Sequence, residues 1–206
     1  PTYGVIPPLV KFGNADYGPY TWPTDATNQI LGMGCAVVSL PPAQISGGLL
    51  AWSALGHETA GHDVTHADEG LLDELAQKVH DAVLSKFKSS SLANYWARCI
   101  DESSADVLGY LNVGPSQGIG LIGYFRALGD GSLRSTGSAD DPHPIDLLRG
   151  YLAANVVKRL KFKGANEWSK IILAETEKDN TGNSCMRYRV MEVLPAPEGA
   201  VMMSIF

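Results

Sequence analysis

The sequence predicts an α+β fold in which a small N-terminal sheet is followed by a mainly helical part. The first 29 residues are rich in Pro, Gly, Tyr and Asn, so turns separate only short segments there. Residues 35–40 are β-prone and end at two prolines. Beyond residue 49, apolar residues recur mainly at helical spacing, which places the helices after the sheet.

Short strands are expected around residues 3–6 and 9–12, with loops in the rest of the first 29 residues. The strand at 35–40 leads into an apolar helix at 49–62. If the edge of that strand is free, it can bind an extended peptide by strand addition, although plain sheet structure explains it equally well.

Further elements follow from the same periodicity. A polar turn is expected after residue 62, and a Gly-rich loop without phosphate-binding spacing at 114–120. The expected helices are 71–87, 92–111, 119–128 and one that begins after the Pro-flanked segment 141–144 and continues to about 162, and the expected C-terminal strands are 186–194 and 201–206.

Size and charge restrict the class of protein. The chain has 206 residues, a mass of 22.0 kDa and 45% hydrophobic residues, so we expect a single domain over residues 1–206 that buries roughly 70% of its unfolded surface. A net charge of -6 and a pI near 5.3 argue against a nucleic-acid partner. The longest apolar run, residues 45–56, is shorter than the roughly 20 residues that span a bilayer, so no membrane span is expected.

The cysteines and the chain ends give two further expectations. Cys35, Cys99 and Cys185 are widely separated and form neither a disulfide framework nor a zinc ribbon. Because the chain starts at Pro1 without a leader and is apolar up to Phe206, we expect a domain excised from a longer protein.

The apolar helix at 49–62 carries a candidate metal site in its last turn. His57 and His62 offer two imidazoles, and Glu58 stands beside the first. In zinc hydrolases the imidazoles hold the ion and such a carboxylate takes a proton from water. These three residues therefore predict a zinc site with Glu58 as general base.

The spacing of the two histidines is one residue longer than in the usual H-E-x-x-H motif. At roughly 100° per residue, positions i and i+5 lie about 140° apart on a regular helix, so His62 would point away from His57. A single π-type turn restores a common face, and the backbone freedom of Gly61 permits it. We therefore expect the two imidazoles to converge on one point.

A second group of acids lies on the helix predicted at 92–111. Glu102 and Asp106 share one face of that helix, whereas acids on a largely apolar face are costly unless they are paired or bind a metal. This predicts Glu102 as third zinc ligand and Asp106 as an acceptor that orients a ligand histidine. Alternatively, Asp101, Glu102 and Asp106 simply face water.

His143 and Arg149 form a third element. His143 stands between two prolines at a rigid helix entry, and Arg149 follows six residues later. Both side chains could therefore face a site.

These three elements, in this order, resemble the gluzincin metallopeptidases over about residues 35–160. Residues 57–62, His-Glu-Thr-Ala-Gly-His, are similar to the His-Glu-x-x-Gly-His motif of dipeptidyl peptidase III, and 101–106 to its Glu-Glu-x-x-Ala-Glu segment. Residues 102–106 and 143–149 resemble the Glu-x-x-x-Asp and His-Pro-x-x-x-x-Arg elements of the CAAX-prenyl-protease-like gluzincins.

The resemblance implies a zincin-like fold and a Zn²⁺-dependent peptidase acting on a peptide or protein substrate. It implies His57, His62 and Glu102 as zinc ligands and Glu58 as general base. Asp106 would accept a hydrogen bond from a ligand histidine and so orient it. His143 and Arg149 would stabilise the tetrahedral intermediate.

Three alternatives remain open. The metal could be held by His62 and His66, which are i and i+4, with Asp63 between them. The domain could be a non-catalytic metal-binding scaffold, in which Glu58 has no role because a structural zinc site is closed. It could also hydrolyse a non-peptide amide by the same chemistry.

Overall fold

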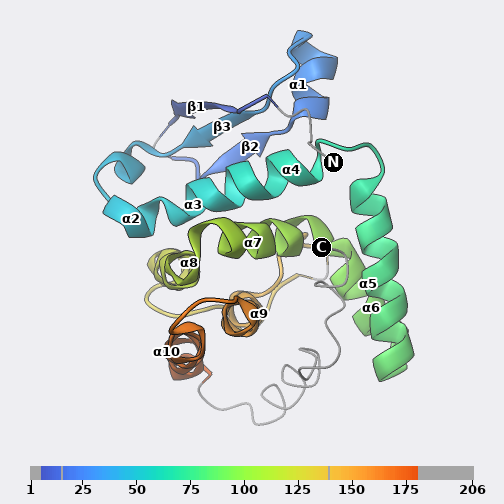
Figure 1. Ribbon diagram of the computed structural model, residues 1–206, viewed down its shortest axis with the longest axis vertical. Coiled ribbons are helices and arrows are strands. Elements are labelled where there is room, and N and C mark those ends of the chain that lie inside the picture. Colours follow the sequence, from blue (N-terminus) through green and yellow to red (C-terminus); the bar gives the residue numbers. More distant parts are fainter. Residues whose placement is uncertain (1–5, 15, 139, 181–206) are drawn as a thin grey trace.

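The computed structural model describes residues 6–14, 16–138 and 140–180 and confirms the α+β prediction. Figure 1 shows a small sheet packed on one side of a long helical segment, with further helices on the other side. The strands expected at 186–194 and 201–206, and nearly all of the one at 3–6, lie outside the described residues.

The sheet has three strands in the order β1-β3-β2. Strand β3 (Val37–Leu40) pairs in parallel with β1 (Leu9–Phe12) and antiparallel with β2 (Tyr20–Trp22). The interpretation in which the strand at 35–40 has a free edge is therefore wrong, and the alternative of plain sheet structure is confirmed. Helix α1 (Thr24–Leu31) connects β2 to β3 and brings the later strand into the middle, which leaves β1 and β2 at the edges.

The helix that carries His57 and His62 runs beneath the sheet as four consecutive helical segments (Figure 1). It extends beyond the predicted end at residue 62, because helical backbone angles continue through His62 and Asp63. The segments are α2 (Gly48–Ala51), α3 (Ser53–Leu55), the π-helical η2 (Gly56–His62) and α4 (Asp63–Thr65).

The next helices lie partly where they were predicted. Helix α5 (Leu71–Phe87) has the predicted bounds. The single helix expected at 92–111 is wrong, because the chain leaves helical geometry at Cys99 (φ -86°, ψ 15°) and divides into α6 (Ser90–Arg98) and α7 (Ile100–Val113). Helices α5 and α6 share a separate apolar cluster, so α7 is free to pack against η2.

The remaining helices are α8 (Pro115–Leu128), α9 (Asp146–Arg159) and α10 (Ala165–Lys178). The Gly-rich loop expected at 114–120 is instead the start of α8. Pro115 at the first helical position favours that start, and the glycines that follow serve close helix packing.

The main apolar core lies among α7, α8, α9 and α10 and is centred on Tyr110, Tyr151 and Ile172. In Figure 1, α7 runs between the helix that carries His57 and His62 and α9, so its two faces meet different neighbours. The acids of α7 are thereby placed between two packed elements. Across the described part of the chain, no helix is both long and apolar enough to cross a membrane.

Candidate metal centre

The imidazoles of His57 and His62 converge, as the predicted π-type turn requires. Their Nε2 atoms lie 3.1 Å apart, although the residues are five positions apart. Segment η2 is π-helical over this stretch, and the Asp63 amide donates to the carbonyl of Glu58, five residues earlier. The π turn rotates His62 onto the face that carries His57.

Gly61 has a different role from the one expected. It is not among the residues with positive φ, so the turn does not depend on glycine's backbone freedom. A Cβ at this position would lie 2.5 Å from the Cα of Ala105 and 2.9 Å from its carbonyl oxygen. Glycine is needed here because the backbones of η2 and α7 approach each other closely.

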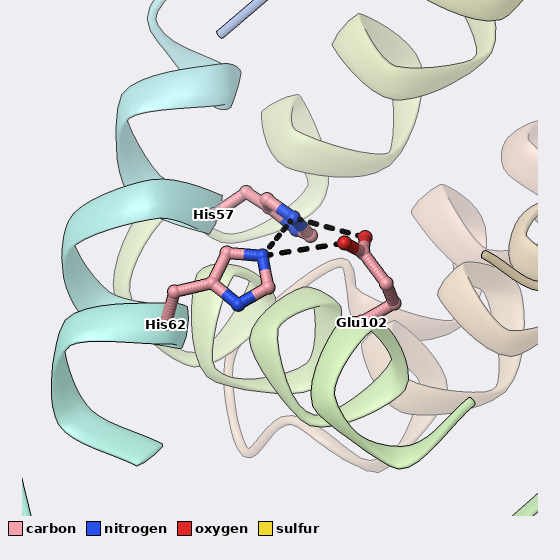
Figure 2. Close-up of side chains that lie close together, drawn as sticks. All are labelled: His57, His62 and Glu102. Atoms are coloured by element: carbon pink, nitrogen blue, oxygen red, sulfur yellow. Dashed lines mark hydrogen bonds and ion pairs between the residues drawn. The ribbon is translucent and has the colours of Figure 1, made fainter. Parts of the chain in front are cut away.

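Glu102 on α7 completes a set of three candidate ligands. Its carboxylate turns one oxygen to each histidine, with Oε2 3.4 Å from His57 Nε2 and Oε1 3.5 Å from His62 Nε2 (Figure 2). Ligand atoms about 2.0–2.1 Å from a tetrahedral zinc ion are themselves roughly 3.3 Å apart. The 3.1 Å between the two Nε2 atoms is close to this value, and one donor atom from each of the three residues lies within 4.8 Å of the other two, so the group could hold a metal ion.

Both histidines direct Nδ1 to a carboxylate on α7. His57 Nδ1 lies 2.9 Å from Asp106 Oδ1, and His62 Nδ1 lies 2.9 Å from Asp101 Oδ1. In neutral imidazoles this arrangement puts the proton on Nδ1 and leaves the Nε2 lone pair free for a metal. The contact predicted for Asp106 is thus present.

The matching contact of Asp101 was not predicted. The two helices place the earlier histidine beside the later acid, so the five-residue interval between His57 and His62 is repeated between Asp106 and Asp101. That repeated interval is the signal in the sequence that would have identified Asp101.

Arg149 stands behind Asp106 in the interior. Its Nε and Nη2 donate to the Asp106 carboxylate at 2.7 and 2.8 Å, and only 4% of the residue is exposed. Burial raises the pKa of Asp106, but Arg149 and the hydrogen bond from His57 lower it more. These contacts make Arg149 a support for Asp106, and its stabilisation of an intermediate stays a prediction.

His143 lies at the outer side of the same group. Its Nε2 is 3.2 Å from Glu102 Oε1, and its Nδ1 is 2.8 Å from the carboxylate of Asp141. The contact with Glu102 is the main reason why the pKa of His143 rises to about 9. About half of the side chain is exposed, so His143 can meet a ligand from solvent.

His66 joins His62 in a second candidate set, as the alternative based on their spacing predicted. Its Nε2 lies 3.2 Å from Asp101 Oδ2, and with His62 these side chains form a second set that could hold an ion. Asp63 is not part of that set, because its buried carboxylate accepts a hydrogen bond from Thr24 instead. His66 and His62 thus share Asp101 as hydrogen-bond acceptor.

The charges of the group favour a divalent cation. Three carboxylates, Asp101, Glu102 and Asp106, surround the two imidazoles, and Arg149 supplies one fixed positive charge. With neutral imidazoles a net charge of about minus two remains, which a divalent ion would balance. Without an ion, burial lowers the pKa of His62, but hydrogen bonds to Asp101 and Glu102 outweigh it and raise that pKa to about 10.

Glu58 lies in the same cavity as the three candidate ligands. The cavity has a volume of about 920 Å³, and its lining includes His57, His62, Glu102 and Glu58. The hydroxyl of Thr21 on β2 donates to Glu58 Oε2 at 2.6 Å and holds the carboxylate in place. Sequence reasoning missed Thr21, because nothing in its local sequence indicates a partner 37 residues away.

Comparison with known proteins finds no matching family model, no similar curated protein and no similar solved structure. The geometry of the site itself is therefore the basis for assigning a function.

Proposed function

We propose that this protein is a zinc-dependent peptidase with a zincin-like fold. In this proposal His57, His62 and Glu102 hold the ion, and Glu58 is the general base. A zinc ion held by these side chains supplies Lewis acidity and makes water acidic enough to lose a proton near pH 7. Glu58 accepts that proton from the water that attacks the carbonyl of the substrate.

The observation that carries the proposal is that three donor side chains converge beside Glu58, a carboxylate that is held in place separately by Thr21. A structural zinc site is closed by four protein ligands, whereas a catalytic site keeps an open position. Here the first candidate set contains three ligands and faces a cavity that Glu58 also lines. This arrangement supports catalysis over a purely structural ion.

The position of β2 supports a peptide as the substrate. Within the described residues, β2 pairs with β3 on one side, and its other edge is unpaired. Tyr20 and Thr21 of this strand line the cavity beside Glu58. An extended peptide can add to such an edge through main-chain hydrogen bonds, which would bring its carbonyl groups next to the site.

The two further predicted residues are suited to different tasks. His143 is half exposed, and its raised pKa keeps it protonated at neutral pH in the metal-free protein. A ring N–H of His143 would donate a hydrogen bond to the oxyanion that develops in the reaction, in whichever protonation state the zinc-bound protein leaves it. Arg149 would contribute indirectly, because it fixes Asp106 and thereby the orientation of His57.

The test combines metal analysis with digestion of a peptide library. Wild type is expected to bind one zinc ion and cleave peptides, whereas Glu58→Gln keeps the zinc and loses cleavage. Glu74→Gln is a matched control, because Glu74 is an exposed residue of α5 paired only with Lys78 in the ion pairs described. It should behave as wild type.

Two outcomes would favour the alternatives. If wild type binds one zinc ion per molecule but cleaves no more peptides than Glu58→Gln does, the domain is a metal-binding scaffold or acts on another amide. If His66→Ala loses as much zinc as His62→Ala, the ion lies in the set that contains His66.

A further inference from the structure

We propose that one end of the cavity is a subsite for a single large apolar side chain of the substrate, and that Gly123 sets its size. This inference rests on the proposed peptidase function and specifies the substrate class of the same site. The subsite lies between the segments α2 and α3 on one side and α8 on the other.

The two ends of the cavity differ in chemistry. Its lining near His143 contains several charged groups, such as Asp101, Arg134 and Asp146. Among the described residues that α2, α3 and α8 contribute to the lining, none is charged. The main apolar members are Leu50, Ala54, Ile119, Leu121, Tyr124 and Leu128.

The apolar end is open to an occupant. Leu50 on α2 and Leu128 on α8 are 52% and 67% exposed, although both line the cavity. Single exposed leucines are common on protein surfaces, but these two belong to a concave site that also contains the candidate zinc ligands. An apolar side chain bound there would remove their surface from water.

Gly123 differs from the two glycines that precede it on α8. A Cβ at Gly120 would lie 2.3 Å from the Ser53 hydroxyl oxygen, and a Cβ at Gly118 would lie 2.9 Å from Ile172, so close packing explains both. A Cβ at Gly123 would meet nothing within 4 Å, and Gly123 lines the cavity. Glycine weakens a helix, and at position 123 the missing side chain leaves free space beside Tyr124.

The occupant follows from these features. Because α2, α3 and α8 contribute no charged group to the described lining, a charged side chain bound between them would lose hydration without gaining a partner from these helices. A small side chain would leave the exposed leucines in water. The geometry therefore points to a residue such as Phe, Leu or Met next to the scissile bond.

The experiment measures kcat/KM on peptides that vary at one position at a time. Wild type is expected to prefer Phe or Leu over Ala at least tenfold at one position flanking the scissile bond. Gly123→Leu fills the space, so this preference should fall at least tenfold. Lys170→Leu is the control, because it adds the same side chain to an exposed position of α10 outside the cavity lining.

A binding measurement separates this inference from the proposed function. Glu58→Gln protein is titrated calorimetrically with Phe-containing and Ala-containing peptides, and with the same peptides after Gly123→Leu is added. Tighter binding of the Phe peptide that Gly123→Leu removes supports the subsite, even if wild type cleaves nothing and the peptidase proposal fails. Cleavage without an apolar preference, or a preference that Gly123→Leu leaves intact, would overturn the subsite while the peptidase stands.

Discussion

Replacing Gly61 by Ala tests whether the close approach of η2 and α7 builds the metal centre. The new Cβ would lie 2.5 Å from both the Cα and the Cβ of Ala105. Carbon atoms in favourable contact are about 3.5–4.0 Å apart, so the two helices must separate locally by roughly 1 Å. Because η2 carries the histidines and α7 carries Glu102, this separation pulls the ligands apart.

The expected magnitudes follow from that displacement. Overpacking of this kind costs about 1–3 kcal/mol, which is roughly 2–12 °C in melting temperature for a chain of this size. Zinc affinity should fall at least tenfold, comparable to the loss of a group that orients a ligand. Both quantities are measured on purified protein, by denaturant unfolding after metal removal and by zinc titration against a chromophoric chelator.

Two further variants locate the cause of the loss. Gly123→Ala places a methyl group in open space on α8, so it should be neutral or stabilise by up to about 1 kcal/mol. Adding Ala105→Gly to Gly61→Ala removes only the Cβ contact and leaves the backbone contacts, so rescue should be partial. If Gly61→Ala alone has the same free energy of unfolding and the same zinc affinity as wild type, the close approach of the two helices does not control the site.

Three other perturbations test single contacts. Asp106→Asn removes the closer of the two carboxylates that pair with the buried Arg149 and leaves only Glu102, 3.5 Å away, so the free energy of unfolding should fall by up to about 3–5 kcal/mol in urea titrations, and an unchanged midpoint would contradict this. Thr21→Val frees the Glu58 carboxylate and should lower kcat roughly tenfold with zinc content intact, whereas loss of zinc would show a structural role instead. In metal-free protein the pKa of His62, raised from 6.5 to about 10, stabilises the fold below pH 6.5 and this contribution is lost as the pH rises towards 10. Urea unfolding in EDTA should therefore show stability decreasing over that range, by at most about 5 kcal/mol, and a rising trend would refute the assignment.

Features that depend on neighbours in the chain could be predicted from the sequence. Apolar periodicity located α5 with its observed bounds, and the five-residue interval between His57 and His62 required a π turn. Glu102 and Asp106 were placed on one face of a helix for the same reason, because helical spacing is a local property. The break at Cys99 was missed, since the apolar pattern continues through it.

Only the tertiary structure decided which distant groups meet. The pairing of Asp101 with His62 spans 39 positions and that of Thr21 with Glu58 spans 37. The repeated five-residue interval indicates Asp101 only once the two helices are known to pack together, and no local pattern encodes the contact of Thr21. The same holds for Arg149, whose engagement with Asp106 depends on α9 packing against α7. The sequence by itself determined the ligand types and their spacing along each helix, whereas the packing of η2 on α7 at Gly61 decided their distances, because only that contact sets how closely the two helices lie.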